Sequence, residues 1–205
     1  MMWETADRAI KEMNRENLKA FGRLKLARWD EMSVIREVKT VYAASIRLAR
    51  KRYREVYRDA YYECLLEIGY SAGEAKRMAM ALDDDWLIEF LEDADPVTLY
   101  AFLPEADRKM MRLIEALAVA LDKNREVDKA LKAWTFQVGQ YTDNSLIQGR
   151  VQAMRDAGVQ YVRWHTQEDE RVCEDCEPLD GKVFPINAMP QIPAHPRCRC
   201  YITPA

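Results

Sequence analysis

Four of the five cysteines lie near the C-terminal end of the chain, in an arrangement that can bind one metal ion. Cys173 and Cys176 form a C-x-x-C pair, and Cys198 and Cys200 form a C-x-C pair that follows His195. The stretch between the two pairs is long enough for a hairpin and a return loop, and two such pairs complete a tetrahedral zinc site. We therefore predict a structural zinc bound by the four cysteines, with His195 as an alternate ligand or a partner of the ligands.

Three other uses of these cysteines stay open: disulfides that form outside the reducing cell, a thioredoxin-like redox motif, and thiols that are merely packed. The redox reading is disfavoured because the C-x-x-C pair lies in the acidic stretch 168–180, and negative neighbours hinder thiolate formation. Catalytic zinc needs an open coordination position and a nearby general base, yet His165 and His195 are the only histidines. The cluster is therefore expected to be a staple, and the protein is not expected to be an enzyme.

Most of the chain that precedes the cysteines is expected to be helical. Charged residues make up 32% and hydrophobic residues 49% of a sequence with only 7 glycines, and apolar side chains recur at helical spacing. Ser71 and Glu74 have the form of a capping box, and Gly158 is a C-terminal stop. The predicted helices cover 2–69 with a break near 29–30, 72–82, a stretch from Pro104 to Leu121, and 126–157 after a turn at 123–125.

After Gly158 the pattern changes to short β-type segments. Residues 159–164 and 200–203 are expected to be strands, and Asp180-Gly181 predicts a hairpin between the runs on either side of it. The fold class is thus mainly α, a long helical body with a small C-terminal β-hairpin module stapled by the cysteine cluster. We expect the domains to be 1–158 and 159–205, and a module that small usually needs a staple.

A second candidate site is a basic stripe on the long N-terminal helix. Arg47, Lys51, Arg54 and Arg58 recur at three- and four-residue spacing and therefore share one helix face. Such a face can contact nucleic-acid phosphates, be solvated, or meet an acidic protein surface. The formal net charge of −3 argues against a wholly basic nucleic-acid binder.

The ends of the chain and its hydropathy bear on localisation. The sequence has no apolar run of about 18 residues and no signal-peptide pattern at its start, so neither a membrane segment nor secretion is expected. We therefore expect the protein to begin in a reducing cytoplasm, where clustered cysteines more often bind metal than form disulfides.

The C-terminal third carries several short motifs in a fixed order. They are the stretch from Tyr141 to Arg150, Trp-x-Thr ending at Thr166, Asp-x-Arg-Val-Cys-x-x-Cys over 169–176, Leu-Asp-Gly at 179–181, and His-Pro-x-Cys-Arg-Cys at 195–200. This order resembles the phage Mu F-like family of tailed-phage minor head, or head morphogenesis, proteins. The resemblance covers about residues 141–205 and says little about residues 1–120.

The resemblance implies a structural component of the phage head that acts at or near the portal. We therefore expect a minor head protein of a tailed phage or prophage, in the host cytoplasm during assembly and then in the virion. The portal protein and other head components would be its partners, packaged DNA would lie nearby, and some such proteins leave the head with the DNA. Two rivals remain: a cellular zinc-ribbon nucleic-acid-binding adaptor, and a small hydrolase that uses the metal of the C-terminal module.

Overall fold

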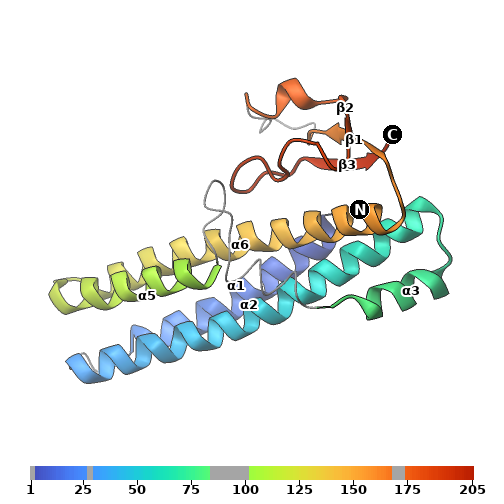
Figure 1. The fold of residues 1–205 in the computed structure, drawn as a ribbon. Helices are drawn as coiled ribbons and strands as arrows, with labels where there is room; N and C mark the ends of the chain where they lie inside the picture. The colour runs from blue at the N-terminus through green and yellow to red at the C-terminus, as the bar shows by residue number, and fades with distance from the viewer. Residues whose placement is uncertain (1–2, 27–29, 84–101, 168–173) are drawn as a thin grey trace. The chain divides into compact units, whose positions relative to one another are not determined.

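The computed structural model describes residues 3–26, 30–83, 102–167 and 174–205, and these are mainly helical (Figure 1). A small three-stranded antiparallel sheet lies near the C-terminus, so the expected fold class is confirmed. None of the helices described is both long enough and apolar enough to span a membrane. The helices are α1 (Glu4–Leu24), α2 (Glu31–Ile68), α3 (Ala72–Ala81), α5 (Phe102–Val119) and α6 (Lys123–Asp156).

The ends of these helices follow local signals in the sequence. The expected break in the N-terminal helix falls between Leu24 and Glu31. At the end of α2, Gly69 takes a φ of 110°, while the amide of Tyr70 donates to the carbonyl of Leu65. This is the Schellman arrangement, which glycine permits because it has no Cβ. The capping box at α3 is confirmed in both directions, from Ser71 to Glu74 and back.

The predicted turn at residues 123–125 is wrong. α6 begins at Lys123, because Asp122 Oδ1 accepts the amide of Arg125 at 3.0 Å and so caps the first turn of the helix. The predicted stop is confirmed, since Gly158 has a φ of 73° and the amide of Val159 donates to the carbonyl of Met154. This second Schellman motif ends α6, and the chain then continues into the sheet.

The chain forms two compact units, each built from separate stretches of sequence. Unit 1 comprises 1–6, 53–82 and 142–205, and unit 2 comprises 7–52 and 83–141. The division into domains at residue 158, which follows the change from helix to strand, stays a prediction.

Unit 2 has an aromatic core. Tyr42 of α2 packs edge-on against Phe21 of α1 at 5.5 Å and against Trp134 of α6 at 5.1 Å between ring centroids. Phe102 of α5 contacts Trp134 and Tyr141 of α6. Such pairs stabilise a core beyond the apolar area that they bury. The rings therefore join the helices of unit 2 into one core.

In unit 1 the C-terminal parts of α2 and α6 pack closely. A Cβ at Gly149 would collide with the carbonyl oxygen of Tyr57, so glycine is what permits this approach. The guanidinium of Arg150 forms two hydrogen bonds with Glu67, at 3.1 and 2.5 Å. Cys64 is fully buried nearby, and its thiol donates to the carbonyl of Arg150 at 3.6 Å. Cys64 thus belongs to the helical core.

The sheet has the order β2-β1-β3, with β1 (Tyr161–His165) paired antiparallel to β2 (Val183–Pro185) and to β3 (Tyr201–Pro204). Alternate residues of β1 are buried, with Val162 and Trp164 both fully enclosed. This period-two burial is what the sequence pattern predicted. Trp164 is therefore the apolar plug of the small module.

The predicted hairpin at Asp180-Gly181 is wrong, because the segments on its two sides do not pair with each other. The residues before it form a short 3-10 helix, η1 (Glu177–Leu179), and the strand after it, β2, pairs with β1. Contacts to the end of β1 decide this outcome. Asp180 Oδ1 accepts the amide of Thr166 at 2.7 Å, and the amide of Gly181 donates to the carbonyl of Trp164. Asp180-Gly181 is thus a turn that leads into β2.

Candidate metal centre

Three of the predicted ligands converge in the structure. The Sγ atoms of Cys176, Cys198 and Cys200 all lie within 4.8 Å of one another, and the three residues are only 1%, 1% and 5% exposed. The Sγ atoms of Cys176 and Cys198 are 3.8 Å apart. A tetrahedral zinc with bonds of about 2.3 Å separates its sulfur ligands by about 3.8 Å. The spacing of this pair therefore fits a tetrahedral metal.

The fourth predicted cysteine, Cys173, lies outside the described residues, as do Asp169 and Arg171 of the same motif. The described ligands come from two places in the chain. Cys176 immediately precedes η1, and its carbonyl accepts the amide of Leu179 at 3.0 Å. Cys200 immediately precedes β3. The pairing of β2 and β3 with the same central strand therefore brings Cys176 close to Cys198 and Cys200.

His195 lies beside the cluster. Its Nε2 is 3.4 Å from Cys176 Sγ, and its Nδ1 is 3.1 Å from the carbonyl oxygen of Pro196. A proton on Nδ1 would be donated to that carbonyl and would leave the Nε2 lone pair directed at the sulfurs, the tautomer that a ligating histidine uses. His195 is thus placed for either predicted role. His165, by contrast, bonds to Thr203 Oγ1 at 2.9 Å and stacks on Tyr201 within the sheet.

The two cysteines of the C-x-C pair differ in acidity. The Cys200 thiol donates to the sulfur of Cys198 and, together with backbone groups of Cys200 and Ala194, lowers the pKa of Cys198 to about 5. The same hydrogen bond and burial raise the pKa of Cys200. One thiolate is therefore favoured within a buried group of three sulfurs, which is the form in which cysteine binds metal.

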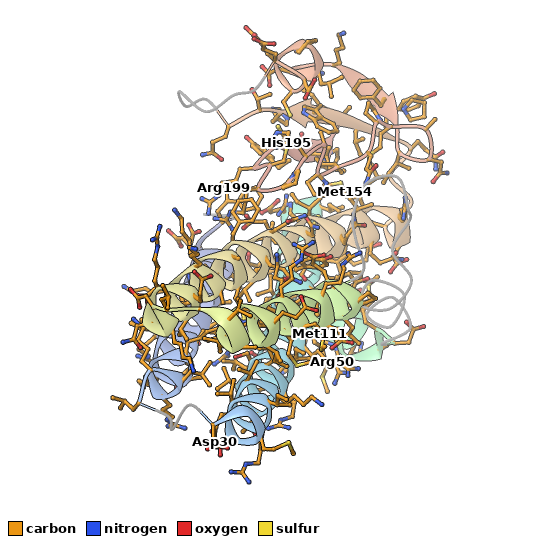
Figure 2. The ribbon with its side chains drawn as sticks, turned by 90° about the vertical axis from the view of Figure 1, so that its left-hand side faces the viewer. Asp30, Arg50, Met111, Met154, His195 and Arg199 are labelled. Carbon is orange, nitrogen blue, oxygen red and sulfur yellow. The ribbon has the colours of Figure 1, made fainter. Side chains whose placement is uncertain are left out.

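Arg199, which is labelled in Figure 2, lies between these two cysteines in the sequence. Its guanidinium carbon lies 5.2 Å from the ring centroid of Trp3, a cation–π geometry. Trp3 is 9% exposed and directly precedes α1. The cysteine-bearing segment is thus held against the start of the first helix.

Two contacts that sequence reasoning missed connect the cysteine-bearing segment to α6. Arg197 Nη1 lies 2.7 Å from Asp143 Oδ2, and Gln148 Nε2 donates to the carbonyl of Ile192 at 3.1 Å. Both α6 residues fall in the stretch from Tyr141 to Arg150 that carries part of the resemblance. The signal that could have found the first contact is a run of four polar residues inside a predicted helix. All four are buried: Thr142, Asp143, Asn144 and Ser145.

The basic stripe on α2 is only partly available to a partner. Arg47, Lys51 and Arg54 are exposed, whereas Arg58 is half-buried and donates to the carbonyl of Leu82 at 3.1 Å. Arg58 therefore has a structural role at the end of α3. None of the four residues belongs to the cysteine cluster.

Comparison with known proteins bears on the same region. Residues 112–203 match the family model described as Phage Mu protein F like protein. The matched segment begins within α5 and includes α6, the sheet and the described cysteines of the cluster. The match confirms the resemblance that the sequence motifs carry. No curated protein and no solved structure matches the chain significantly.

Proposed function

We propose that this chain, whose residues 112–203 form a phage Mu F-like region, is a structural minor head protein of a tailed phage or prophage. The family match carries the proposal, because it indicates a phage head morphogenesis protein. In the finer form of the proposal the protein is not an enzyme, associates with the portal during head assembly and resides in the virion. Its work is to bind and position other head components.

We also propose that Cys176, Cys198 and Cys200 bind one zinc ion, with Cys173 or His195 as the fourth ligand. The residues fit the ion because their sulfurs are close, buried and directed at one another. A zinc held in this way would cross-link the segment before η1 to the segment before β3 and contribute folding free energy. The burial of the ligands supports a closed, structural site.

Two residues beside the cysteines contact helices of unit 1, so a zinc that orders the cluster would also restrain these contacts. Arg197 contacts Asp143 of α6, and Arg199 contacts Trp3 at the start of α1. Both arginines lie beside Cys198, so ordering the sulfurs also orders these two side chains. The cluster therefore supports a rigid surface in unit 1 on which a partner can dock.

Direct analysis of particles tests the proposed function. The chain should be found by mass spectrometry in purified DNA-filled virions and should copurify with the portal protein when the two are expressed together. A major capsid protein from the same particles is the positive control for recovery. Absence of the chain both from assembling procapsids and from virions would exclude a head protein.

A nucleic-acid-binding role is the second candidate, and the exposure of Arg47, Lys51 and Arg54 in one register of α2 favours it. Reversing these three charges should weaken any affinity for duplex DNA and flatten its dependence on salt. The matched control reverses Lys76 and Arg77, which are exposed on α3. Arg58 is left unchanged because it supports the end of α3. If the wild-type protein shows no salt-dependent affinity for duplex DNA, the hypothesis of a nucleic-acid-binding adaptor is wrong.

A further inference from the structure

Unit 2 contains a cavity of about 190 Å³ between α2, α5 and α6. α5 and α6 lie side by side in both views, and their facing sides carry small residues at this point (Figures 1 and 2). Ala116 of α5 and Ala130 and Ala133 of α6 line the space together with Leu113. Larger side chains at the alanine positions would fill it, so the hollow results from these three residues.

Tyr42 forms part of the wall of this cavity, together with the alanine and leucine side chains. Its Oη is itself buried, so the hydroxyl does not open onto the cavity. Charged side chains complete the lining: Lys109, Arg112, Glu126 and Lys129. The wall therefore suits an apolar occupant that has charged groups beside it.

The rim of the cavity carries positive charge. Lys109 pairs with Glu105 at 2.9 Å, and Lys129 pairs with Glu126 at 2.6 Å. Arg112 also lines the cavity, is exposed, and forms no ion pair within the described part of the chain. Because Glu105 also pairs with Arg108, the basic groups at the rim outnumber the carboxylates. The Arg112 guanidinium can bind a carboxylate in a planar, two-pronged geometry.

An exposed aromatic residue lies one turn further along α6. Phe136 follows Ala133 by three residues and is 55% exposed. Aromatic residues and arginine are enriched in protein–protein interfaces, so its exposure is consistent with a partner on this helix.

We propose that this cavity is an anchor site for a partner protein, and that it receives a phenylalanine- or leucine-type side chain flanked by acidic residues. The apolar side chain fills the space between the alanines, and a flanking carboxylate pairs with Arg112. The inference deepens the proposed function and rests on it only for the identity of the partner as another head component.

A short peptide tests the chemistry of the site without knowledge of the partner. The probe is acetyl-Ser-Glu-Phe-Glu-Ser-amide, titrated into the full chain while the alanine methyl signals are followed by NMR. We expect saturable shifts of the Ala116, Ala130 and Ala133 methyl groups. The peptide with lysine in place of glutamate should bind at least about tenfold more weakly, and so should the peptide with alanine in place of phenylalanine.

Substitutions in the protein give the matching test. Ala130→Leu fills the cavity and should abolish binding, whereas Ala81→Leu, at an exposed position on α3, should leave it unchanged. Arg112→Glu should reverse the preference between the glutamate and lysine peptides. Far-UV circular dichroism and thermal melts verify that each variant is folded.

Three results would overturn the proposal: no shift at the cavity methyls, equal affinity for the acidic and basic peptides, or retained binding in folded Ala130→Leu. The first of these would mean that the cavity holds only water. Peptide binding does not depend on where the protein resides, and detection in virions does not depend on this cavity. Failure of the anchor site is therefore distinguishable from failure of the head-protein assignment.

Discussion

Arg197 Nη1 lies 2.7 Å from Asp143 Oδ2, an ion pair that joins the cysteine-bearing segment to the middle of α6. The two side chains differ sharply in exposure, at 32% for Arg197 and 1% for Asp143. The contact is close in distance, although its angles fall outside hydrogen-bond geometry. The contact therefore contributes to stability mainly by balancing the charge of the buried Asp143 carboxylate.

This asymmetry predicts unequal costs for removing the two partners. Arg197→Ala leaves a buried carboxylate without this cation, whereas Asp143→Ala leaves an arginine that still reaches water. Arg197→Ala should lower the free energy of unfolding by about 2–3 kcal/mol, below the figure for a fully buried pair because Arg197 is partly solvated. Asp143→Ala should cost less. Chemical denaturation measures both, with Asp107→Ala, at an exposed site on α5, as the control. Equal costs would contradict the interpretation.

The contact between Arg199 and Trp3 predicts a measurable coupling. A double-mutant cycle with Arg199→Gln and Trp3→Leu should give a coupling free energy of about 0.5–1 kcal/mol, because a cation over an indole face is worth that much when partly exposed. The control cycle replaces Arg155, an exposed residue of α6, in combination with Trp3→Leu and should give no coupling. A coupling of zero in the first cycle would show that the cation–π contact contributes nothing to stability.

The metal proposal predicts the composition of the purified protein. Protein prepared without chelator should contain about one zinc per chain by elemental analysis, and chelator should lower its melting temperature. Cys176→Ser should lose the metal. Cys64→Ser, a matched change at a buried cysteine of the helical core, should retain it. Zinc-free protein whose melting temperature is insensitive to chelator would rule out the site.

The fourth ligand can be identified by the same measurement. Cys173→Ser and His195→Ala should differ in zinc content, and the variant that loses more metal identifies the ligand. His195 Nε2 lies 3.4 Å from Cys176 Sγ, close to the separation of about 3.5 Å between nitrogen and sulfur ligands of one tetrahedral zinc. If both variants retain full zinc occupancy, a site with one of these two residues as fourth ligand is wrong.

The turn at Asp180 predicts a dependence of stability on pH. The amide of Thr166 donates to the Asp180 carboxylate and holds the pKa of that carboxyl below its usual range. The folded pKa is thus lower than the unfolded value of about 3.9, so this stabilisation is present above that value and is lost as pH falls through the folded pKa. The difference in unfolding free energy between wild type and Asp180→Asn should therefore shrink as pH falls from 6 to 3, by an amount limited by solvent screening. A difference that stays constant with pH would contradict this role.

Local signals in the sequence predicted the helix ends well. The capping box at Ser71 and the glycine stop at Gly158 depend only on residues within one turn, so their chemistry can be read directly. The predicted start of α6 was wrong, although the cap that Asp122 provides is an equally local contact. The spacing of the cysteines predicted that they could meet, and the structure brings together Cys176, Cys198 and Cys200.

The rest depends on contacts between distant residues. Hydrophobic periodicity cannot show that Asp143 is buried, because it is polar and its ion-pair partner, Arg197, lies far along the chain. Likewise, Asp180-Gly181 was correctly placed in a turn, but contacts with Thr166 and Trp164 select the strand that pairs beside it. Long-range pairing of this kind leaves no pattern in a single sequence.

The contact of Arg199 with Trp3 has a consequence for the order of events during synthesis. Trp3 is synthesised long before Arg199, and unit 1 is assembled from three stretches of the chain that are far apart in sequence. Trp3 therefore lacks this neighbour until the segment that carries Arg199 has been translated. Residues 7–52 and 83–141, which make up unit 2, all precede that segment. A translating chain would thus contain every residue of unit 2 while its cysteine-bearing segment is still being made.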